Sequence, residues 1–402
     1  MSLNTDPIKG WEIRPSTGKH FDFLDGLRGI AILMVVSTHT FYVNPQAGSV
    51  MQAVGGLLST GVMGVPIFFV LSGFLISYPF FLKRANQAGF WHLEGYPRRR
   101  IGKILPPFYL SIIIFTFYYL VRYGDPHCLL ISAKYALGLP NFFPTPTLLY
   151  TSVYWSLIIE VHFYIVLPFL FYLTRGLGLH QTVAIIAVIL FFVPFIVRQF
   201  TWPWYDQSQA SVNFHVNRLP CSLDYFAWGV LFAGIHASFL NTGNKLKKLA
   251  LLGYVGMVSM AATCSIFAFC IIHYNILVFP IRLSVEAYHF LPGISVFLIL
   301  FFAFDPVCLG ARFLAQPWLR FVGIVSYEWF LFHEPVVILV AETMGQTKGS
   351  AISYLIKTVL PLALTFIASV AIYRYFSLPL MNLIRGKTRR KKTLTPTLIV
   401  AD

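Results

Sequence analysis

Residues 24–39 read LDGLRGIAILMVVSTH, an apolar segment that carries an arginine and a histidine. Arg28 and His39 lie eleven positions apart. That spacing is close to three turns of an α-helix, so the two side chains share one face, about 16 Å apart along the axis. Ionisable groups are costly in hydrocarbon and usually mark a functional interior surface of a membrane protein. The pair predicts a site that holds a charged group at one end and performs chemistry at the other.

The composition of the chain indicates a membrane protein. Of its 402 residues, 57% are hydrophobic and only 11% are charged, about half the charged fraction of soluble domains. The apolar residues fall in long runs, which predicts an all-α, polytopic integral membrane protein with about ten transmembrane helices. We expect these helices at residues 23–43, 61–82, 104–122, 151–174, 179–198, 219–240, 249–272, 286–304, 318–343 and 350–376.

The distribution of charge sets the expected topology. The net charge of +15 comes from basic residues between the spans and in the tail, a pattern of membrane orientation and anionic-lipid contact rather than of nucleic-acid binding. We expect a cytoplasmic segment at 1–22, a transmembrane domain at 23–380 and a disordered basic cytoplasmic tail at 381–402, in the cytoplasmic (inner or plasma) membrane. No signal peptide precedes the first helix, which we expect to be an uncleaved anchor.

Two longer segments, 123–150 and 199–218, are predicted to face the outside as folded or partly re-entrant loops. Cys128 and Cys221 fall in outside-facing regions, and the sequence leaves open whether they form a disulfide. No cysteine or histidine spacing typical of a metal site is present, so we expect no metal cofactor.

Five sequence blocks, taken in order, resemble the membrane-bound acyltransferase-3 family, in its stand-alone membrane-domain form. The resemblance covers about residues 24–380. It implies O-acylation of sugars, polysaccharides or small natural products. The blocks are DGLRG at 25–29 with His39, FFVLSGFLI at 68–76, RRRIGKILP at 98–106, WSLIIE at 155–160 with Tyr164 and Pro168, and Ser326-Tyr327 with His333 and Pro335.

The residues of the first block also have purely structural interpretations. Arg28 is close enough to the helix end to extend its guanidinium to the membrane interface. A single histidine in a membrane helix is more often a hydrogen-bonding contact between helices. The shared face favours function instead, because imidazole titrates near neutrality and suits a general base that takes a proton from a hydroxyl.

The basic run before the third predicted helix is expected to lie in a cytoplasmic loop. Some of its charges serve orientation only, but Arg100 and Lys103 are three apart and can hold phosphates from one side of a helix start. By resemblance, they match the basic pair proposed to bind acyl-coenzyme A, and we add Arg99 as a third candidate. Lys103 stands where the family typically has arginine, which keeps the charge but loses bidentate geometry.

Polar groups inside later helices complete the candidate site. Glu160 is either a structural partner of a basic residue such as Arg28 or His333, or a functional group that orients the catalytic histidine or binds acceptor hydroxyls. Tyr164 lies one turn on and extends its network, as a substrate-binding candidate. His333, by resemblance a core residue of the family, shares a face with Ser326, a second substrate-binding candidate that also reads as an interhelical contact. Small residues near the second predicted helix, Gly61, Gly64, Ser72 and Gly73, are expected to allow close helix approach.

Charged residues near the outer ends of later helices are candidates for acceptor binding. Arg218 and Asp224 flank the start of the sixth predicted helix, and we propose both as substrate-binding residues. Arg282 and Glu286 lie four apart, and a salt bridge between them is the default expectation.

The favoured function is transfer of an acyl group, expected to be acetyl, from acetyl-coenzyme A or another acyl-coenzyme A to a hydroxyl of a carbohydrate or related acceptor. Arg28, Arg99, Arg100 and Lys103 would bind the coenzyme, and His39, Glu160 and His333 would form the catalytic group. The membrane lipids are expected partners, and the oligomeric state stays open. So does the choice between direct transfer and an acyl-enzyme intermediate. The alternative is a proton-coupled transporter or flippase of a lipid-linked sugar or small anion, because buried Arg, His and Glu side chains fit such a pathway too.

Overall fold

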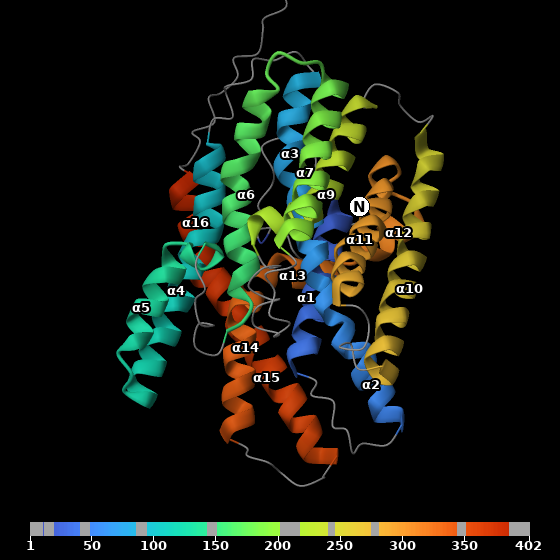
Figure 1. The fold of residues 1–402 in the computed structure, drawn as a ribbon. Helices are drawn as coiled ribbons and strands as arrows, with labels where there is room; N and C mark the ends of the chain where they lie inside the picture. The colour runs from blue at the N-terminus through green and yellow to red at the C-terminus, as the bar shows by residue number, and fades with distance from the viewer. Residues whose placement is uncertain are drawn as a thin grey trace, which may run out of the picture.

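The computed structural model describes residues 11, 20–40, 49–85, 95–142, 151–201, 218–239, 246–274, 281–343 and 351–385. The elements in these ranges are helical, as the sequence predicts, and form the bundle of Figure 1. The long helices are α1 (Asp22–Thr40), α3 (Gly64–Ala85), α4 (Tyr96–Tyr123), α6 (Tyr154–Leu173), α7 (Leu179–Thr201), α9 (Leu219–Ser238), α10 (Leu251–Tyr274), α11 (Ile281–Ile299), α14 (Ser326–Thr343) and α15 (Ala351–Ile372). The shorter ones are α2 (Ser49–Ser59), α5 (His127–Ala136), α12 (Leu309–Leu314), α13 (Pro317–Ile324) and α16 (Leu378–Arg385).

Seven helices in the described part of the chain are long and apolar enough to cross a membrane, and the bent pair α13–α14 would make eight. α1 and α9 are not among them, although the sequence predicts a span at both places. Both lie inside the bundle: α9 is buried on nearly every side, between α3, α7 and α11. Neighbouring protein replaces lipid around these two helices, so they can carry polar groups at lower cost. The count of about ten and the location of the termini stay predictions.

Glycines set the closest helix contacts of the core. A Cβ atom on Gly73 of α3 would lie 2.3 Å from the carbonyl oxygen of Phe226 in α9, and one on Gly229 of α9 would lie 1.9 Å from that of Val70. Any larger side chain would force these two backbones apart. The close approach predicted for this small-residue block is therefore confirmed.

The glycines of the first sequence block have the same role. A Cβ atom on Gly26 would lie 1.6 Å from the carbonyl oxygen of Leu314, and one on Gly29 would lie 2.3 Å from that of Leu319. α1 therefore lies directly against α12 and α13. Gly323 of α13 is equally close to the backbone of Asp25.

The contact between α13 and α1 explains one wrong prediction. The sequence predicts a single helix over 318–343, but the helix breaks at Val325 and bends by 68°. α13 lies against α1, and α14 packs against α15, α1 and α4. The bend lets one stretch of chain contact α1 through α13 and still reach α15 through α14.

Three other boundaries differ from the prediction. The basic run at 98–103 is not in a loop but in the first turns of α4, which begins at Tyr96 after Gly95, whose φ of +73° favours glycine, with Pro97 in its first turn. The outer segment 123–150 contains α5, a ten-residue helix that packs against α4. The tail expected to be disordered from residue 381 is helical up to Arg385, in α16.

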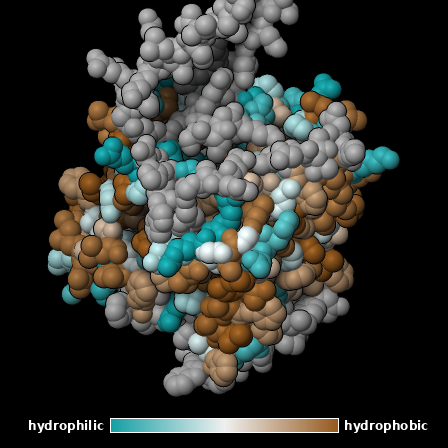
Figure 2. Space-filling model, turned by 90° about the horizontal axis from the view of Figure 1, so that it is seen from above, coloured by the Kyte–Doolittle hydropathy of each residue, from teal (hydrophilic) through white to brown (hydrophobic). Residues whose placement is uncertain are grey.

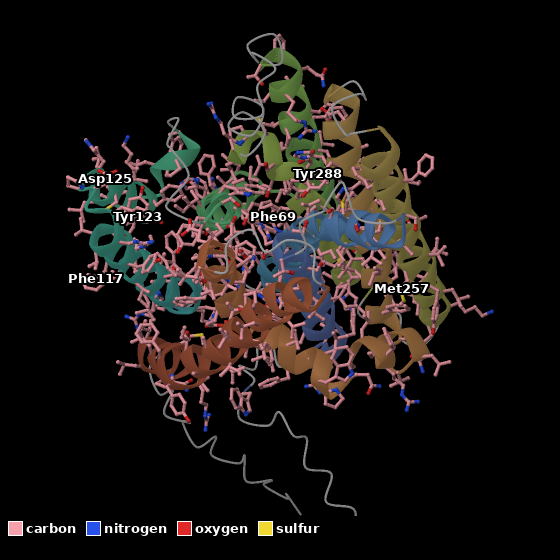
Figure 3. The ribbon with its side chains drawn as sticks, turned by 90° about the horizontal axis from the view of Figure 1, so that it is seen from below. Phe69, Phe117, Tyr123, Asp125, Met257 and Tyr288 are labelled. Atoms are coloured by element: carbon pink, nitrogen blue, oxygen red, sulfur yellow. The ribbon has the colours of Figure 1, made fainter. Side chains whose placement is uncertain are left out.

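The periphery of the bundle is apolar. Figure 2 shows brown, hydrophobic side chains over much of the outer rim of the bundle seen from above. Among them, Phe117 on α4 is 67% exposed, whereas Phe69 on α3 is 2% exposed. In Figure 3, Phe117 lies at the edge of the molecule and Phe69 near its centre. Such an apolar outer surface suits contact with lipid, as expected for a multi-pass membrane protein.

Candidate functional site

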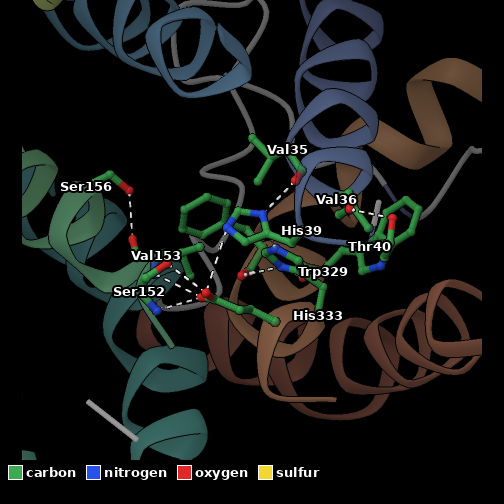
Figure 4. Close-up of polar contacts among 11 residues, drawn as sticks. Val35, Val36, His39, Thr40, Ser152, Val153, Ser156, Trp329 and His333 are labelled. Carbon is green, nitrogen blue, oxygen red and sulfur yellow. Dashed lines mark hydrogen bonds and ion pairs between the residues drawn. The ribbon is translucent and has the colours of Figure 1, made fainter. Parts of the chain in front are cut away.

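Two predicted site residues, His39 and His333, lie against each other although 294 residues separate them in the chain. α1 carries His39 near its end, and α14 carries His333 in its middle. Nε2 of His333 is 3.3 Å from Nδ1 of His39, and the ring centroids are 4.9 Å apart in an edge-to-face arrangement. His333 is fully buried, and Figure 4 shows the two rings facing each other between their helices.

The partners of the rings define where each neutral histidine carries its proton. Nδ1 of His39 is 2.8 Å from the carbonyl oxygen of Val35, and Nδ1 of His333 is 2.9 Å from that of Phe330. A carbonyl oxygen only accepts, so both Nδ1 atoms are donors. The single proton on Nδ1 of His39 is then shared between the Val35 carbonyl oxygen, which is nearer, and Nε2 of His333. Nε2 of His39 is left with its lone pair, which is the form that a general base needs.

A carboxylate faces that free nitrogen. Oε1 of Glu334 lies 3.8 Å from Nε2 of His39. The Glu334 carboxylate accepts hydrogen bonds from the backbone N–H of Ser152 at 2.6 Å, the Ser152 hydroxyl at 2.7 Å and the backbone N–H of Val153 at 3.3 Å (Figure 4). It is thus fixed beside His39, where its charge would stabilise the imidazolium that forms when Nε2 takes a proton.

Sequence reasoning missed Glu334 and assigned its role to Glu160. The structure brings Glu160 to other partners: its Oε1 accepts from the hydroxyls of Ser72 at 2.5 Å and Tyr164 at 2.7 Å. The predicted link between Glu160 and Tyr164 is therefore confirmed, whereas the groups in contact with His39 are His333 and Glu334. The signal available in the sequence was a carboxylate directly after a histidine in an apolar helix.

The basic residues at the start of α4 point towards Glu160 and α1. Lys103 is close enough to interact electrostatically with Arg28, Arg100 and Glu160. The guanidinium of Arg100 donates to the carbonyl oxygen of Leu75 at 3.3 Å and lies over the ring of Tyr164, 5.6 Å from its centre. The structure thus groups the predicted cofactor-binding residues Arg28, Arg100 and Lys103. Arg99 lies beside Arg100 and is half-buried.

A narrow cavity of about 50 Å³ lies beside Arg28, and its lining includes neither Arg100 and Lys103 nor the two histidines. Its polar walls are Arg28, Ser72, Ser156, Glu160, Ser326 and Tyr327, and its apolar walls are Val65, Phe68, Phe69, Leu157 and Phe330. We call it the central cavity. Phe330 lies one turn before His333 on α14, so the apolar end approaches the histidine pair. The volume suffices for a few water molecules.

Glu328 is a second buried carboxylate that the sequence analysis missed. It is 2% exposed and lies within electrostatic reach of Lys103 and Arg28. Its Oε2 atom has no hydrogen-bond partner among the described residues. Three cations, Arg28, Arg100 and Lys103, thus lie near three carboxylates, Asp25, Glu160 and Glu328, so the charges of the group balance in number.

The outer candidates form a separate cluster. The Arg198 guanidinium lies 2.8 Å from Asp224 and donates to Glu286 at 2.7 Å and 3.0 Å. The expected salt bridge between Arg282 and Glu286 concerns a side chain outside the described residues and stays a prediction. Nδ1 of His289 is 3.0 Å from Asp224. Sequence reasoning gave no site role to Arg198 and did not name His289.

Comparison with known proteins settles the family. Residues 21–374 match a family model described as an acyltransferase domain, the acyltransferase-3 model. The chain belongs to this acyltransferase family. The resemblance carried by the five sequence blocks is therefore confirmed, and the family favours an enzyme over the transporter alternative.

Curated relatives of this acyltransferase-family chain include O-acetyltransferases of bacteria. The chain is 24% identical to peptidoglycan O-acetyltransferase OatA of Listeria monocytogenes over 385 residues, which cover 90% of this chain and 56% of the relative. It is 22% identical to O-acetyltransferase OatA of Staphylococcus aureus, with 89% of this chain and 56% of that relative covered. It is 28% identical to acyltransferase MdmB of Streptomyces mycarofaciens over 44% of this chain and 46% of the relative. The chain thus spans about half the length of the curated relatives it matches. No solved structure matches it.

The remaining predictions concern single residues. Cys128 and Cys221 are both buried and both are free thiols, so the structure does not pair them. Arg218 lies at the start of α9 and Ser326 lines the central cavity. In the part of the chain that the structure describes, no group of three His, Cys, Asp or Glu side chains is placed to hold a metal ion.

Proposed function

We propose that the protein is a membrane O-acyltransferase that moves an acyl group, acetyl by likeness to its relatives, from acyl-coenzyme A to a hydroxyl group. The observation that carries this proposal is Nε2 of His39, an unshared basic nitrogen beside a carboxylate fixed by three hydrogen bonds. The family match and the O-acetyltransferase relatives support the reaction class.

The proposed reaction uses His39 as both base and acid. The acceptor hydroxyl gives its proton to Nε2 of His39 while its oxygen bonds to the acyl carbon of the thioester. The carbon–sulfur bond then breaks, and the imidazolium returns the proton to the leaving thiolate. The products are an ester and a free thiol, and His39 is neutral again.

Two neighbours would support His39 in this reaction, one through its tautomer and one through its charge. His333 accepts from Nδ1 and so holds the ring in the tautomer that leaves Nε2 free. Glu334 would stabilise the transient positive charge without a change of position. We propose direct transfer, because among the described residues no serine, threonine or cysteine hydroxyl or thiol hydrogen-bonds to Nε2 of His39.

The donor would bind at the basic end of the central cavity. Its phosphates would form charge-assisted hydrogen bonds with Arg28, Arg100 and Lys103. The apolar walls would then guide the thioester arm towards His39. Because the cavity has only about 50 Å³, it must widen when the arm binds, and we expect side chains such as Phe68 and Phe330 to move apart.

The acceptor is proposed to be a carbohydrate. One curated relative is named a peptidoglycan O-acetyltransferase, and a sugar hydroxyl is the group that the proposed base would deprotonate. The cytoplasmic side is proposed for the basic end and the outer side for the histidines, by the positive-inside rule.

The test is acyl transfer by the full chain, purified in detergent. Acetyl-coenzyme A labelled in its acetyl group is mixed with soluble peptidoglycan fragments and other saccharides. We expect alkali-labile label on a saccharide and release of one thiol per ester formed. His39→Ala should lose both, and Ser37→Ala, a neighbour on α1 that donates only to the carbonyl oxygen of Met34, should keep both.

Two outcomes would contradict the proposal. Normal transfer by a folded His39→Ala variant would remove His39 as the base. Movement of a saccharide across proteoliposomes, with no ester formed under any donor, would favour a transporter.

A further inference from the structure

A second and larger cavity lies between α7, α9 and α11. Its volume is about 420 Å³, within the range of about 300–1,000 Å³ that small-molecule sites usually have. Phe191, Phe192, Phe195, Trp228 and Phe290 form its apolar walls. We call it the lateral cavity, since it lies outside the set of residues that line the central cavity.

The mouth of the lateral cavity faces the apolar surface of the bundle. Phe192, Phe195 and Phe290 line it and are 58%, 48% and 52% exposed, whereas Trp228 on its inner wall is buried. α7 carries the first two of these rings and is long and apolar enough to cross a membrane. A ligand of this cavity therefore reaches it from the lipid phase and must have an apolar chain.

The inner end of the cavity presents one unsatisfied polar atom. His289 is 1% exposed, and its Nε2 has no hydrogen-bond partner among the described residues. Nδ1 of the same ring lies 3.0 Å from Oδ1 of Asp224. The Arg198 guanidinium, which only donates, lies 3.2 Å from the same Nδ1, so this nitrogen has a donor and an acceptor beside it. A ligand hydroxyl, which can donate or accept, would satisfy Nε2 in either tautomer.

The charges around His289 restrict which polar headgroup a ligand of the lateral cavity can have. One cation, Arg198, lies between two carboxylates, Asp224 and Glu286. The excess of negative charge opposes a phosphate headgroup. Both carboxylates already pair with Arg198, so they offer little compensation for the desolvation of an ammonium group in an aromatic cavity. A neutral hydroxyl is neither repelled by the carboxylates nor costly to desolvate as a charge would be.

We propose that the lateral cavity binds a lipid that bears a free hydroxyl group. The hydroxyl forms a hydrogen bond with Nε2 of His289, and the apolar chain lies among Phe191, Phe195 and Phe290. This proposal does not depend on the acyl-transfer function, since it uses none of the residues proposed to bind the donor or to perform the transfer.

The lateral cavity lies close to the central one. The ring of Tyr225 stacks on His289 with a centroid distance of 4.2 Å and also stacks on Phe69, with a centroid distance of 5.4 Å. Phe69 lines the central cavity and lies near the middle of the molecule in Figure 3, as does Tyr288, the residue before His289. The bound hydroxyl would thus lie two aromatic rings from the proposed donor site.

The test compares four probes with the same twelve-carbon chain: dodecanol, dodecylamine, dodecyl phosphate and dodecane. Each is added to the full chain in detergent, and the midpoint of thermal unfolding is followed. A ligand that binds only the folded state raises this midpoint by mass action. We expect dodecanol to raise it by several degrees and the other three to raise it less than half as much.

Three variants locate the effect. His289→Phe should lose the preference for dodecanol, and Phe195→Ala should weaken the dodecanol shift at least threefold in apparent affinity. Phe200→Ala is the matched control, since Phe200 lies on the same helix, is 77% exposed and does not line the cavity; it should behave as the wild type. If His289→Phe does not fold, the pair Phe195→Ala and Phe200→Ala still decides the location.

The proposal is overturned by equal shifts with all four probes, by a larger shift with dodecylamine or dodecyl phosphate, or by no shift at all. It is also overturned if the dodecanol preference survives in His289→Phe, or if Phe195→Ala and Phe200→Ala respond alike.

Discussion

The two buried histidine–carboxylate clusters of this protein have similar parts and different charge balance. Glu334 beside His39 is held by backbone N–H groups and a serine hydroxyl, and no lysine or arginine of the described residues pairs with it. Asp224 beside His289 shares the guanidinium of Arg198 with Glu286. The first carboxylate keeps its charge available to an imidazolium, and the second does not. Contact with a carboxylate is therefore weak evidence that a histidine acts as a base. The evidence is stronger where no arginine or lysine pairs with that carboxylate.

The largest expected effect tests the structural side of this comparison. Arg198→Met would leave Asp224 and Glu286 buried without their cation, which should lower the free energy of unfolding by about 3–5 kcal/mol. Thermal unfolding in detergent measures the loss. Arg312→Met, an exposed position, is the control and should change stability by less than about 0.5 kcal/mol. A stable Arg198→Met variant would mean that the cluster does not depend on this ion pairing.

The next effect tests the catalytic side. Glu334→Gln keeps the side-chain volume and one acceptor for Ser152 but removes the charge that would stabilise the imidazolium. We expect kcat for acyl transfer to fall about 10–100-fold, equal to about 1.4–2.7 kcal/mol of transition-state stabilisation, with KM for the acceptor nearly unchanged. Glu342→Gln, an exposed position on the same helix, should match the wild type. An unchanged kcat in Glu334→Gln would break the distinction between the two clusters.

A third effect separates donor binding from chemistry. Lys103→Met removes one cation from the basic end of the central cavity and should raise KM for acyl-coenzyme A about tenfold, the equivalent of about 1.4 kcal/mol. The value of kcat should change less than about threefold. Arg98→Met is the matched control, because Arg98 is exposed near the start of the same helix. If both variants raise KM equally, the effect is general attraction by positive charge and not a site.

The smallest effect concerns the residue that fixes Glu334. Ser152→Ala removes one of the three hydrogen bonds to the carboxylate, which should cost about 1 kcal/mol and lower kcat about fivefold. Ser265→Ala, exposed on α10 and bonded only to the carbonyl oxygen of Ala261, should leave kcat unchanged. A loss in Ser152→Ala as large as that in Glu334→Gln would show that position, rather than charge, is what Glu334 contributes.

Much of the fold could be predicted because, in a membrane protein, the length of an apolar run predicts a membrane-spanning helix. The expected ranges 179–198 and 249–272 lie within three residues of α7 and α10 at every boundary. The helices outside the expected ranges, α2, α5, α12 and α16, have eleven, ten, six and eight residues, which is too short for a span by themselves. The break at Val325 was missed because it results from contact between α13 and α1, which no local pattern contains.

The candidate site also has residues that the sequence could predict and residues that it could not. His39, His333, Arg28 and Lys103 could be named from the sequence because each is a polar residue in or beside an apolar helix, where such residues are costly. Their partners could not. Glu334 was passed over and Glu160 was given its place, because spacing along one helix cannot tell which of two buried carboxylates faces a histidine on another.

The sequence by itself determined the all-helical membrane class, the family and the placement of Arg28 and His39 on one helix, since these depend on composition, local periodicity and motif order. Only the tertiary structure decided that His39 meets His333 and Glu334, that Glu160 joins Ser72, and that Arg198 binds Glu286. These contacts join residues 88 to 295 positions apart. Helix packing, set by close contacts such as those of Gly73 in α3 and Gly229 in α9, selects them. Periodicity fixes the face that a side chain occupies, and packing fixes what that face meets.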